Sequence, residues 1–157
     1  MHALSESLED YLEAIYHIVG EKQAARATDI RERMGVSGSS VTGALRALAE
    51  RGLVNYAPYD IITLTAKGEA AAEDVVHRHG VLRGFFVEVL GLPETTADEA
   101  ACGMEHHIGK LVQRRLAYLG QFLASNPRLD RAEWLASFLE FCEQREQALP
   151  EADGGER

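Results

Sequence analysis

The segment from residue 27 to residue 64 constrains the fold more than any other part of this sequence. Apolar residues at helical spacing predict a short helix over 27–35 and a second helix over 41–51, with the Ser- and Gly-containing turn 36–40 between them. Two short runs of strand-forming residues follow at 53–56 and 61–64, with a Pro-containing turn between the runs. Helix, turn, helix and hairpin in this order predict a winged helix-turn-helix, whose second helix enters the major groove of DNA.

The amino end of the predicted second helix is rich in hydroxyl groups, and arginines follow along the same helix. Hydroxyls and free N–H groups at a helix start suit contacts with phosphate. The candidate DNA-binding residues are Ser37, Ser39, Ser40, Thr42, Arg46 and Arg51. An ordinary pair of helices with a serine cap is the structural alternative.

The charge of the chain is unevenly distributed. The whole chain carries a net charge of −9, yet residues 22–51 hold six basic side chains against three acidic ones. Because phosphate contacts need positive charge, the net negative charge of the whole chain excludes indiscriminate nucleic-acid binding. The basic segment 22–51 is compatible with DNA binding that is assisted, for example by divalent cations that neutralise clustered carboxylates.

The remainder of the chain is expected to be helical. A long helix is predicted over 66–90, and a Thr-x-x-Glu capping pattern at Thr96 and Glu99 predicts the start of another. Two more amphipathic helices are predicted over 110–125 and 131–147. The sequence therefore predicts a mainly α fold, with an N-terminal winged helix-turn-helix domain over 1–70, a helical domain over 71–148 and a disordered tail over 149–157.

Cys102, Glu105 and His106 are spaced three and four residues apart. On a helix this spacing places a thiolate, a carboxylate and an imidazole on one face, as half of a site for a transition metal. Asp10 and Glu13 form a second pair one turn apart, although two acids near a helix start also suit the helix dipole without any metal.

His79 lies in the long predicted helix between these two groups. A helical histidine is more often structural than a metal ligand. The candidate metal ligands are Asp10, Glu13, His79, Cys102, Glu105 and His106.

Several motifs together resemble the DtxR/MntR metalloregulators, over nearly the whole chain to about residue 145. The resemblance is carried by residues 9–16, 36–54 and 64–68, by Arg78-His79 and by Glu105-His106-His107. It implies an N-terminal winged helix-turn-helix followed by a helical dimerisation and metal-binding domain. It also implies a homodimeric repressor that binds operator DNA when loaded with Fe²⁺ or Mn²⁺.

Matched position by position, the manganese-type members imply Asp10, Glu13, His79, Glu105 and His106 as ligands. The chain departs from both branches of the family. It has Cys102 where the manganese sensors carry Glu, as the iron branch does. Arg83 stands where the iron branch has an acid of its second site. The third, SH3-like domain of the iron branch is expected to be absent.

Carboxylates suit hard Mn²⁺, whereas imidazole and thiolate favour later metals. The six candidate ligands are enough for two adjacent metals if one acid bridges them. The thiol of Cys102 makes Fe²⁺ the expected effector, with Mn²⁺ next, while Co²⁺, Ni²⁺ or Zn²⁺ would substitute in vitro. Metal is expected to join the N-terminal helix that carries Asp10 and Glu13 to the dimer domain, and so to fix the separation of the two DNA-reading helices of the dimer.

Two alternatives have a different function. One is a metal-independent winged-helix regulator that binds a small organic effector, and the other is a hydrolase with a dinuclear metal site. The sequence shows no separate nucleophile or phosphate loop, so no enzyme and no small organic substrate are expected. No apolar run approaches the length of a membrane span, and the polar N-terminus and two cysteines predict a cytoplasmic protein without a membrane partner.

Overall fold

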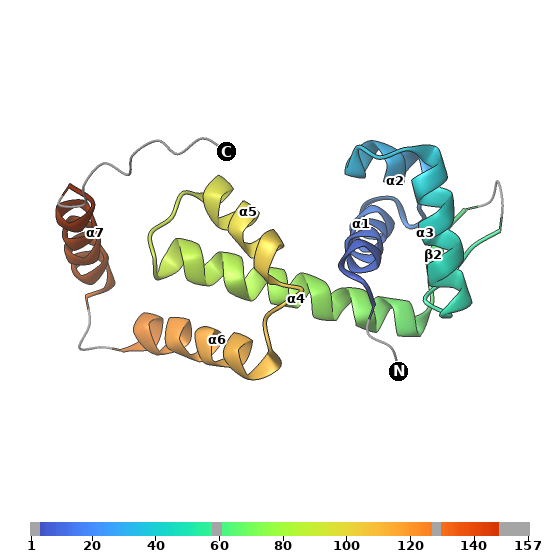
Figure 1. The fold of residues 1–157 in the computed structure, drawn as a ribbon. Helices are drawn as coiled ribbons and strands as arrows, with labels where there is room; N and C mark the ends of the chain where they lie inside the picture. The colour runs from blue at the N-terminus through green and yellow to red at the C-terminus, as the bar shows by residue number, and fades with distance from the viewer. Residues whose placement is uncertain (1–3, 58–60, 127–129, 148–157) are drawn as a thin grey trace. The chain divides into compact units, whose positions relative to one another are not determined.

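The computed structural model describes residues 4–57, 61–126 and 130–147 (Figure 1). Contacts between Cα atoms divide the chain into two units. The first comprises Met1–Gly80 and Glu105–His107, and the second comprises Val81–Met104 and Ile108–Arg157. The predicted wing turn at 57–60 and the predicted tail at 149–157 lie almost wholly outside the described residues.

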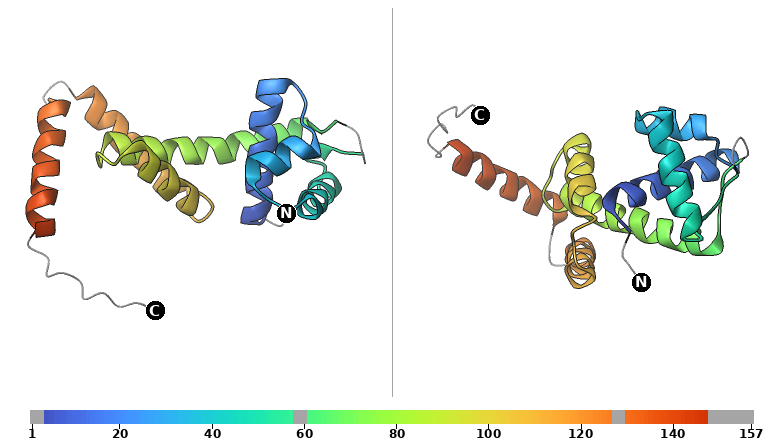
Figure 2. Two further views of the ribbon diagram at one scale, coloured as in Figure 1. Left: turned by 90° about the horizontal axis from the view of Figure 1, so that it is seen from above. Right: turned by 45° about the vertical axis from the view of Figure 1, so that its right-hand side comes forward.

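Three helices of the first unit, α1 (Glu6–Lys22), α2 (Ala27–Met34) and α3 (Gly38–Glu50), pack against one another (Figure 2). Each helix turns an apolar stripe inward, as a period of 3.6 residues requires. Large side chains that are almost completely buried come from all three helices and from the wing: Leu12, Ile15, Ile30, Val41, Leu45, Leu48 and Ile62. The core of the first unit therefore lies beneath α3, the second helix of the helix-turn-helix.

The turn between α2 and α3 confirms the helix-turn-helix. Gly35 ends α2 in the left-handed region at φ 65°, a conformation that glycine adopts without steric cost. Ser37 caps α3, and its Oγ accepts a hydrogen bond from the Ser40 N–H at 3.1 Å. This cap starts α3 at Gly38 and not at Val41, so Ser39 and Ser40 belong to its first turn.

The wing is a two-stranded antiparallel hairpin that is shorter than predicted. Val54 of β1 (Val54–Asn55) pairs with Leu64 of β2 (Thr63–Leu64), and Ile62 forms an additional bridge to Ala25.

The chain leaves the wing through a close approach that only glycine allows. A Cβ at Gly68 would lie 1.8 Å from the carbonyl oxygen of Leu53. Thr65 secures the same junction, because its Oγ1 donates to the Gly52 carbonyl at 2.7 Å and accepts from the Gly68 N–H at 3.0 Å.

The second unit is entirely helical among its described elements. Helix α4 (Ala66–Glu88) begins in the first unit and ends in the second, and it is followed by α5 (Glu94–Met104), α6 (Lys110–Ser125) and α7 (Arg131–Gln147). A small core gathers around Leu82, Phe86, Ala97 and Ala101. The prediction of a mainly α protein with an N-terminal winged helix-turn-helix is confirmed.

Both predicted ends of the α5 region are wrong. The helix begins at Glu94, and the Pro93 carbonyl accepts the Ala97 N–H at 2.9 Å, so Thr96 lies inside the helix and does not cap it. The helix ends at Met104, and residues 105–107 form a turn. Cys102 therefore lies within α5, whereas Glu105 and His106 lie in the turn that follows it and do not continue the helix as expected.

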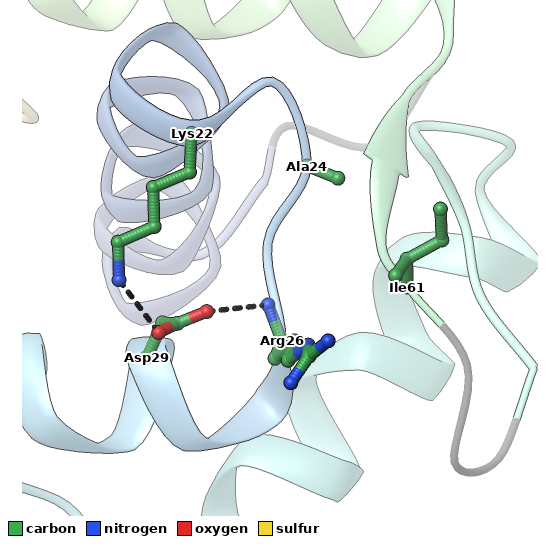
Figure 3. Close-up of a pocket in the computed structure, with 5 residues that line it drawn as sticks. All are labelled: Lys22, Ala24, Arg26, Asp29 and Ile61. Carbon is green, nitrogen blue, oxygen red and sulfur yellow. Dashed lines mark hydrogen bonds and ion pairs between the residues drawn. The ribbon is translucent and has the colours of Figure 1, made fainter.

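A pocket on the first unit lies where the end of α1 faces the start of α2 and the wing (Figure 3). Lys22 Nζ donates to Asp29 Oδ1 at 2.8 Å, and the Arg26 N–H donates to Asp29 Oδ2 at 2.9 Å. These bonds hold the pKa of Asp29 below its usual value and that of Lys22 above. The pocket contains none of the candidate metal ligands. None of the described helices has the length and apolarity that crossing a membrane demands.

Candidate metal centre

The turn after α5 brings two candidate ligands to the first helix. Each of Asp10, Glu105 and His106 offers a ligand atom, and these atoms all lie within 4.8 Å of one another. The three residues belong to the first unit, although they are far apart in the sequence. A metal site needs this arrangement, in which side chains from separate segments place their ligand atoms close together.

Glu105 is the most deeply buried member, with 1% of its surface exposed. Its Oε2 is hydrogen-bonded to His79 Nδ1 of α4 at 2.7 Å, while its Oε1 lies 3.5 Å from His106 Nε2. One carboxylate thus faces both imidazoles, each through a different oxygen. The structure therefore joins His79 to the cluster through Glu105.

The His106 side chain is 7% exposed and faces a carboxylate with each ring nitrogen. Nδ1 is hydrogen-bonded to Glu9 Oε2 at 2.7 Å, and Nε2 lies 2.9 Å from Asp10 Oδ1. Adjacent residues of α1 therefore hold opposite edges of the same ring. When only Nδ1 carries a proton, the Nε2 lone pair points at carboxylate oxygens, an unfavourable arrangement unless a second proton or a metal ion lies between them.

Two buried atoms show that the cluster suits a cation. Within the described part of the chain, neither Glu105 Oε1 nor His106 Nε2 has a hydrogen-bond partner, because the short separation to Asp10 is not aligned as a hydrogen bond. Buried polar atoms are ordinarily satisfied, and leaving one unpaired costs about 1–3 kcal/mol. Two carboxylates and one imidazole are good ligands for a divalent first-row metal, so the residues fit such an ion.

The pKa shifts agree with this fit. Burial raises the pKa of the Glu105 carboxyl, the charge of Glu13 raises it further, and the His79 hydrogen bond offsets only part of the rise. Burial alone would lower the pKa of His106, but the Glu9 hydrogen bond and the charges of Asp10 and Glu105 outweigh it and raise the value. In both groups the protein favours positive charge at the centre of the cluster.

The other two candidate ligands are placed differently. Glu13 is half-buried and lies 3.6 Å from His17 Nε2, and its charge reaches Glu105 although it is outside the group of three. Cys102 is exposed near the end of α5, belongs to the second unit and forms no disulfide. The three-residue group therefore consists of oxygen and nitrogen ligands alone.

Two residues of the cluster were not predicted as functional. Glu9 accepts from Arg78 NH2 at 2.6 Å as well as contacting His106, and Arg78 NH1 bonds to Asp74 at 3.2 Å. Each sits beside a predicted ligand in sequence, Glu9 before Asp10 and Arg78 before His79. The available signals were their position next to a candidate ligand and their place in the motifs that carry the family resemblance. Helical periodicity does not reveal a pair between distant helices.

The predicted DNA-binding residues lie along α3 and at its ends. All are exposed except Thr42, which is half-buried. Ser37 Oγ is within 2.8 Å of the hydroxyls of both Ser39 and Ser40, and Thr42 Oγ1 donates to the Gly38 carbonyl at 3.0 Å. Arg51 NH1 donates to the Ala47 carbonyl at 2.8 Å. The hydroxyls thus form a local network at the start of the helix.

Two family models match this chain, one over its N-terminal part and one over most of the remainder. The family model "Iron dependent repressor, N-terminal DNA binding domain" matches residues 3–61. The model "Iron dependent repressor, metal binding and dimerisation domain" matches residues 65–133. The two models together cover most of the chain, and their boundary falls at the end of the wing.

Curated relatives extend the similarity over most of their own length. An uncharacterised HTH-type transcriptional regulator of Methanocaldococcus jannaschii is 40% identical over 114 residues, which are 72% of this chain and 91% of the relative. The HTH-type transcriptional regulator MntR of Shouchella clausii is 37% identical over 120 residues, which are 76% and 83% of the two chains.

A solved manganese-dependent transcriptional repressor, in complex with manganese, superposes with a TM-score of 0.66 at 30% identity. The match covers 73% of this chain and 53% of the solved chain, so this chain spans about half of that structure's length. The family contains regulators and not enzymes, which removes the hydrolase alternative, and its metal dependence removes the metal-independent one. The chain belongs to the DtxR/MntR family of metal-dependent transcriptional repressors.

Proposed function

We propose that this chain is a homodimeric repressor that binds operator DNA when Fe²⁺ or Mn²⁺ is held by Asp10, Glu105 and His106. His79 and Glu13 would complete the site or support it, and Cys102 is the remaining candidate ligand. The observation that carries the proposal is a pair of buried atoms beside the Asp10 carboxylate, Glu105 Oε1 and His106 Nε2, that have no hydrogen-bond partner among the described residues.

The ligand types limit the metal to a small set. Carboxylate oxygens suit Mn²⁺, whereas imidazole nitrogen favours Fe²⁺ and later metals, so the group of three contains ligands for both. The exposed thiol of Cys102 lies outside this group. The similar proteins also name both metals. The solved repressor is manganese-dependent, and the matching family models describe iron-dependent repressors. Co²⁺, Ni²⁺ and Zn²⁺ are expected to bind in vitro because imidazole accepts all of them.

Chain connectivity suggests how the site would control the protein. The turn Glu105–His107 belongs to the first unit, while its neighbours Met104 and Ile108 belong to the second. A bound cation would supply the positive charge that allows the carboxylates and the imidazole to converge. Asp10 and the turn would then be held together, and the turn would restrain the chain that leads into α5 and α6.

The surface of α3 supports operator binding. Val41, Leu45 and Leu48 face the core, and the opposite side exposes Ser39 and Arg46. Phosphate contacts from hydroxyls and arginines give affinity, and the DNA sequence would be read by the same helix in the major groove. We therefore propose residues 1–70 as the DNA-binding domain and 71–148 as the domain for dimerisation and metal binding.

The second unit supports a homodimer. Large apolar side chains that stay exposed are concentrated on α6 and α7: Leu111, Val112, Tyr118, Leu119, Phe122, Leu139 and Phe141. A soluble chain rarely leaves such a surface to water, so a second copy would cover it. With two copies, the two recognition helices would read two half-sites.

The test measures metal binding and DNA binding separately. Titration calorimetry with Mn²⁺, and with Fe²⁺ under anaerobic conditions, gives the affinity for each metal. A duplex selected from a random pool by the Mn²⁺-loaded protein then serves as the DNA probe, with and without chelator. We expect Asp10→Ala and Glu105→Ala to remove the metal-dependent part of DNA binding. Retention of that part in both variants would show that the proposed site is wrong.

A further inference from the structure

Two adjacent residues of α1 contact opposite edges of one imidazole. Glu9 Oε2 lies 2.7 Å from His106 Nδ1, and Asp10 Oδ1 lies 2.9 Å from His106 Nε2. Only the Nε2 edge faces Asp10 and Glu105, where a metal would bind. The Nδ1 edge is turned away from those ligands, so Glu9 contacts the ring where no metal ligand is needed.

Arg78 fixes the charge and the position of Glu9. Its NH2 donates to the same Oε2 atom at 2.6 Å, and its NH1 is held by Asp74 at 3.2 Å. The side chains of Glu9 and Arg78 are only 17% and 13% exposed, so water screens their pairing poorly. A guanidinium is permanently charged and donates only, so a carboxylate bound to it remains an acceptor.

Carboxylates face both ring nitrogens of His106, and the two edges differ in what else they contact. On the Nδ1 edge Glu9 is bound to Arg78, stays an acceptor and keeps a proton on Nδ1. A cation bound by Asp10 and Glu105 would take the place of the Nε2 proton and meet the Nε2 lone pair. We propose that Glu9, held by Arg78, is a positioning residue that keeps His106 in the Nδ1–H tautomer, with Nε2 directed at the metal. The inference rests on the proposed metal function and adds a role for two residues that are not themselves ligands.

A second carboxylate–imidazole pair on the same helix provides a matched control. Glu6 Oε1 lies 3.0 Å from His107 Nε2, but these side chains are 60% and 68% exposed. The pair contains the same chemical groups as Glu9 and His106. Glu6 lies one helical turn before Glu9, and His107 directly follows His106. The Glu6 pair is exposed, and no arginine of the described chain is paired with its carboxylate. Replacing Glu6 therefore repeats the chemical change made at Glu9 but leaves the contacts of His106 intact.

The experiment compares Glu9→Gln with Glu6→Gln in the full-length chain. Manganese affinity is measured from the EPR signal of free Mn²⁺, and the His106 tautomer from long-range ¹H–¹⁵N spectra of the metal-free protein with neutral imidazoles. We expect Glu9→Gln to weaken Mn²⁺ binding by roughly 10- to 100-fold, the usual loss when such a partner is removed. The spectra should show the Nε2–H tautomer appearing, because glutamine can donate to Nδ1 as well as accept from it. Glu6→Gln should change neither quantity.

Arg78→Lys gives a second route if Glu9→Gln does not fold. Lysine keeps the charge but cannot reach both Glu9 and Asp74 as the guanidinium does, so Glu9 is held less firmly on Nδ1. A smaller loss of affinity and a smaller shift of the tautomer toward Nε2–H are therefore expected. An unchanged His106 tautomer in both variants would overturn the inference, even if the affinity falls. Failure of the wild-type protein to bind Mn²⁺ or Fe²⁺ would instead overturn the proposed function.

Discussion

The two units of this protein differ in how completely they bury their apolar residues. The first unit encloses one continuous core to which α1, α2, α3 and the wing all contribute. The core of the second unit is built from Leu82, Phe86, Ala97 and Ala101, two of which are alanines. All but one of the large apolar side chains that remain exposed in the described chain belong to the second unit, Ile61 being the exception.

This difference indicates where each unit obtains its stability. A core of large, fully buried side chains stabilises the first unit by itself, and its ligand cluster adds a polar centre that a cation can satisfy. The second unit leaves α6 and α7 apolar on the outside, so a partner surface is needed to remove that area from water. The two proposed roles, DNA binding by the first unit and subunit pairing by the second, thus place opposite demands on the surfaces of the two units.

The largest expected effect comes from a core residue of the first unit. Leu45 is completely buried, so Leu45→Ala should lower the free energy of unfolding by about 2–5 kcal/mol, measured in urea. Leu111→Ala is the matched change in the second unit, where the side chain is 58% exposed. Under conditions that keep the chain monomeric, its loss should be within about 0.5 kcal/mol. Equal losses would contradict the contrast between the units.

Metal should stabilise the first unit most directly. Free Mn²⁺ at one hundred times its Kd should add about 2.7 kcal/mol to the free energy of unfolding. Hydrogen exchange should show the gain among the amides of α1, and chelator should reverse it. Glu105→Gln should abolish the effect, because the variant replaces a carboxylate that we propose as a ligand. Equal protection of α7, or none in α1, would show that the metal binds elsewhere.

Pairing of subunits should depend on the second unit alone. Phe122 is 58% exposed on α6, and Phe122→Asp should weaken the homodimer by about 2 kcal/mol or more, roughly 30-fold in Kd. Analytical ultracentrifugation over a dilution series measures this change. Ile61→Asp, at a 52% exposed apolar residue of the first unit, is the control and should leave the dimer intact. Dissociation by Ile61→Asp would place the dimer surface in the wrong unit.

The smallest effect concerns pH. Because the folded-state pKa of His106 is raised above 6.5, the stabilisation that its protonation gives the metal-free fold is complete below that pH and disappears as pH rises through the raised pKa. Metal affinity should change in the opposite direction, gaining up to about 1.4 kcal/mol per pH unit for each proton displaced.

The contribution of His106 is the difference between the wild-type protein and His106→Asn, with stability followed by urea unfolding and affinity by calorimetry. Metal affinity that is independent of pH from 6 to 8, a range of order one unit on each side of neutrality, would contradict the competition between proton and metal.

Much of the helical architecture could be predicted because its signals are local. Gly35 ends α2 and Ser37 caps α3 within a few residues of the apolar stripes they delimit. The end of α5 could not be predicted in this way. Glu105 and His106 are spaced as if they continued the helix, but they contact His79 and Glu9, residues 26 and 97 positions away. These tertiary contacts place them in a turn, where local periodicity has no influence.

Part of the cluster of candidate metal ligands could be predicted from the sequence, and part could not. Asp10, His79, Glu105 and His106 were identified from chemistry and spacing together with a family resemblance, and the structure brings them together. Cys102 was predicted from an expected helical face and from the resemblance to the iron branch, and it stays a candidate ligand on α5, which ends at Met104. Glu9 and Arg78 were missed because their role lies in a contact between α1 and α4. Arg83, which replaces an expected acid, bonds to Glu94 at 2.8 Å.

The turn Glu105–His107 lies in one unit while the helices on both sides of it belong to the other. A fragment that stops at Gly80 would therefore contain the apolar core of the first unit but only Asp10 of the three clustered candidate ligands. A fragment that begins at Val81 would hold the other two without their partner. The proposed metal site is thus built from non-contiguous sequence, so a chimera that exchanges halves between relatives is expected to respond to metal only where the turn and α1 come from matching parents.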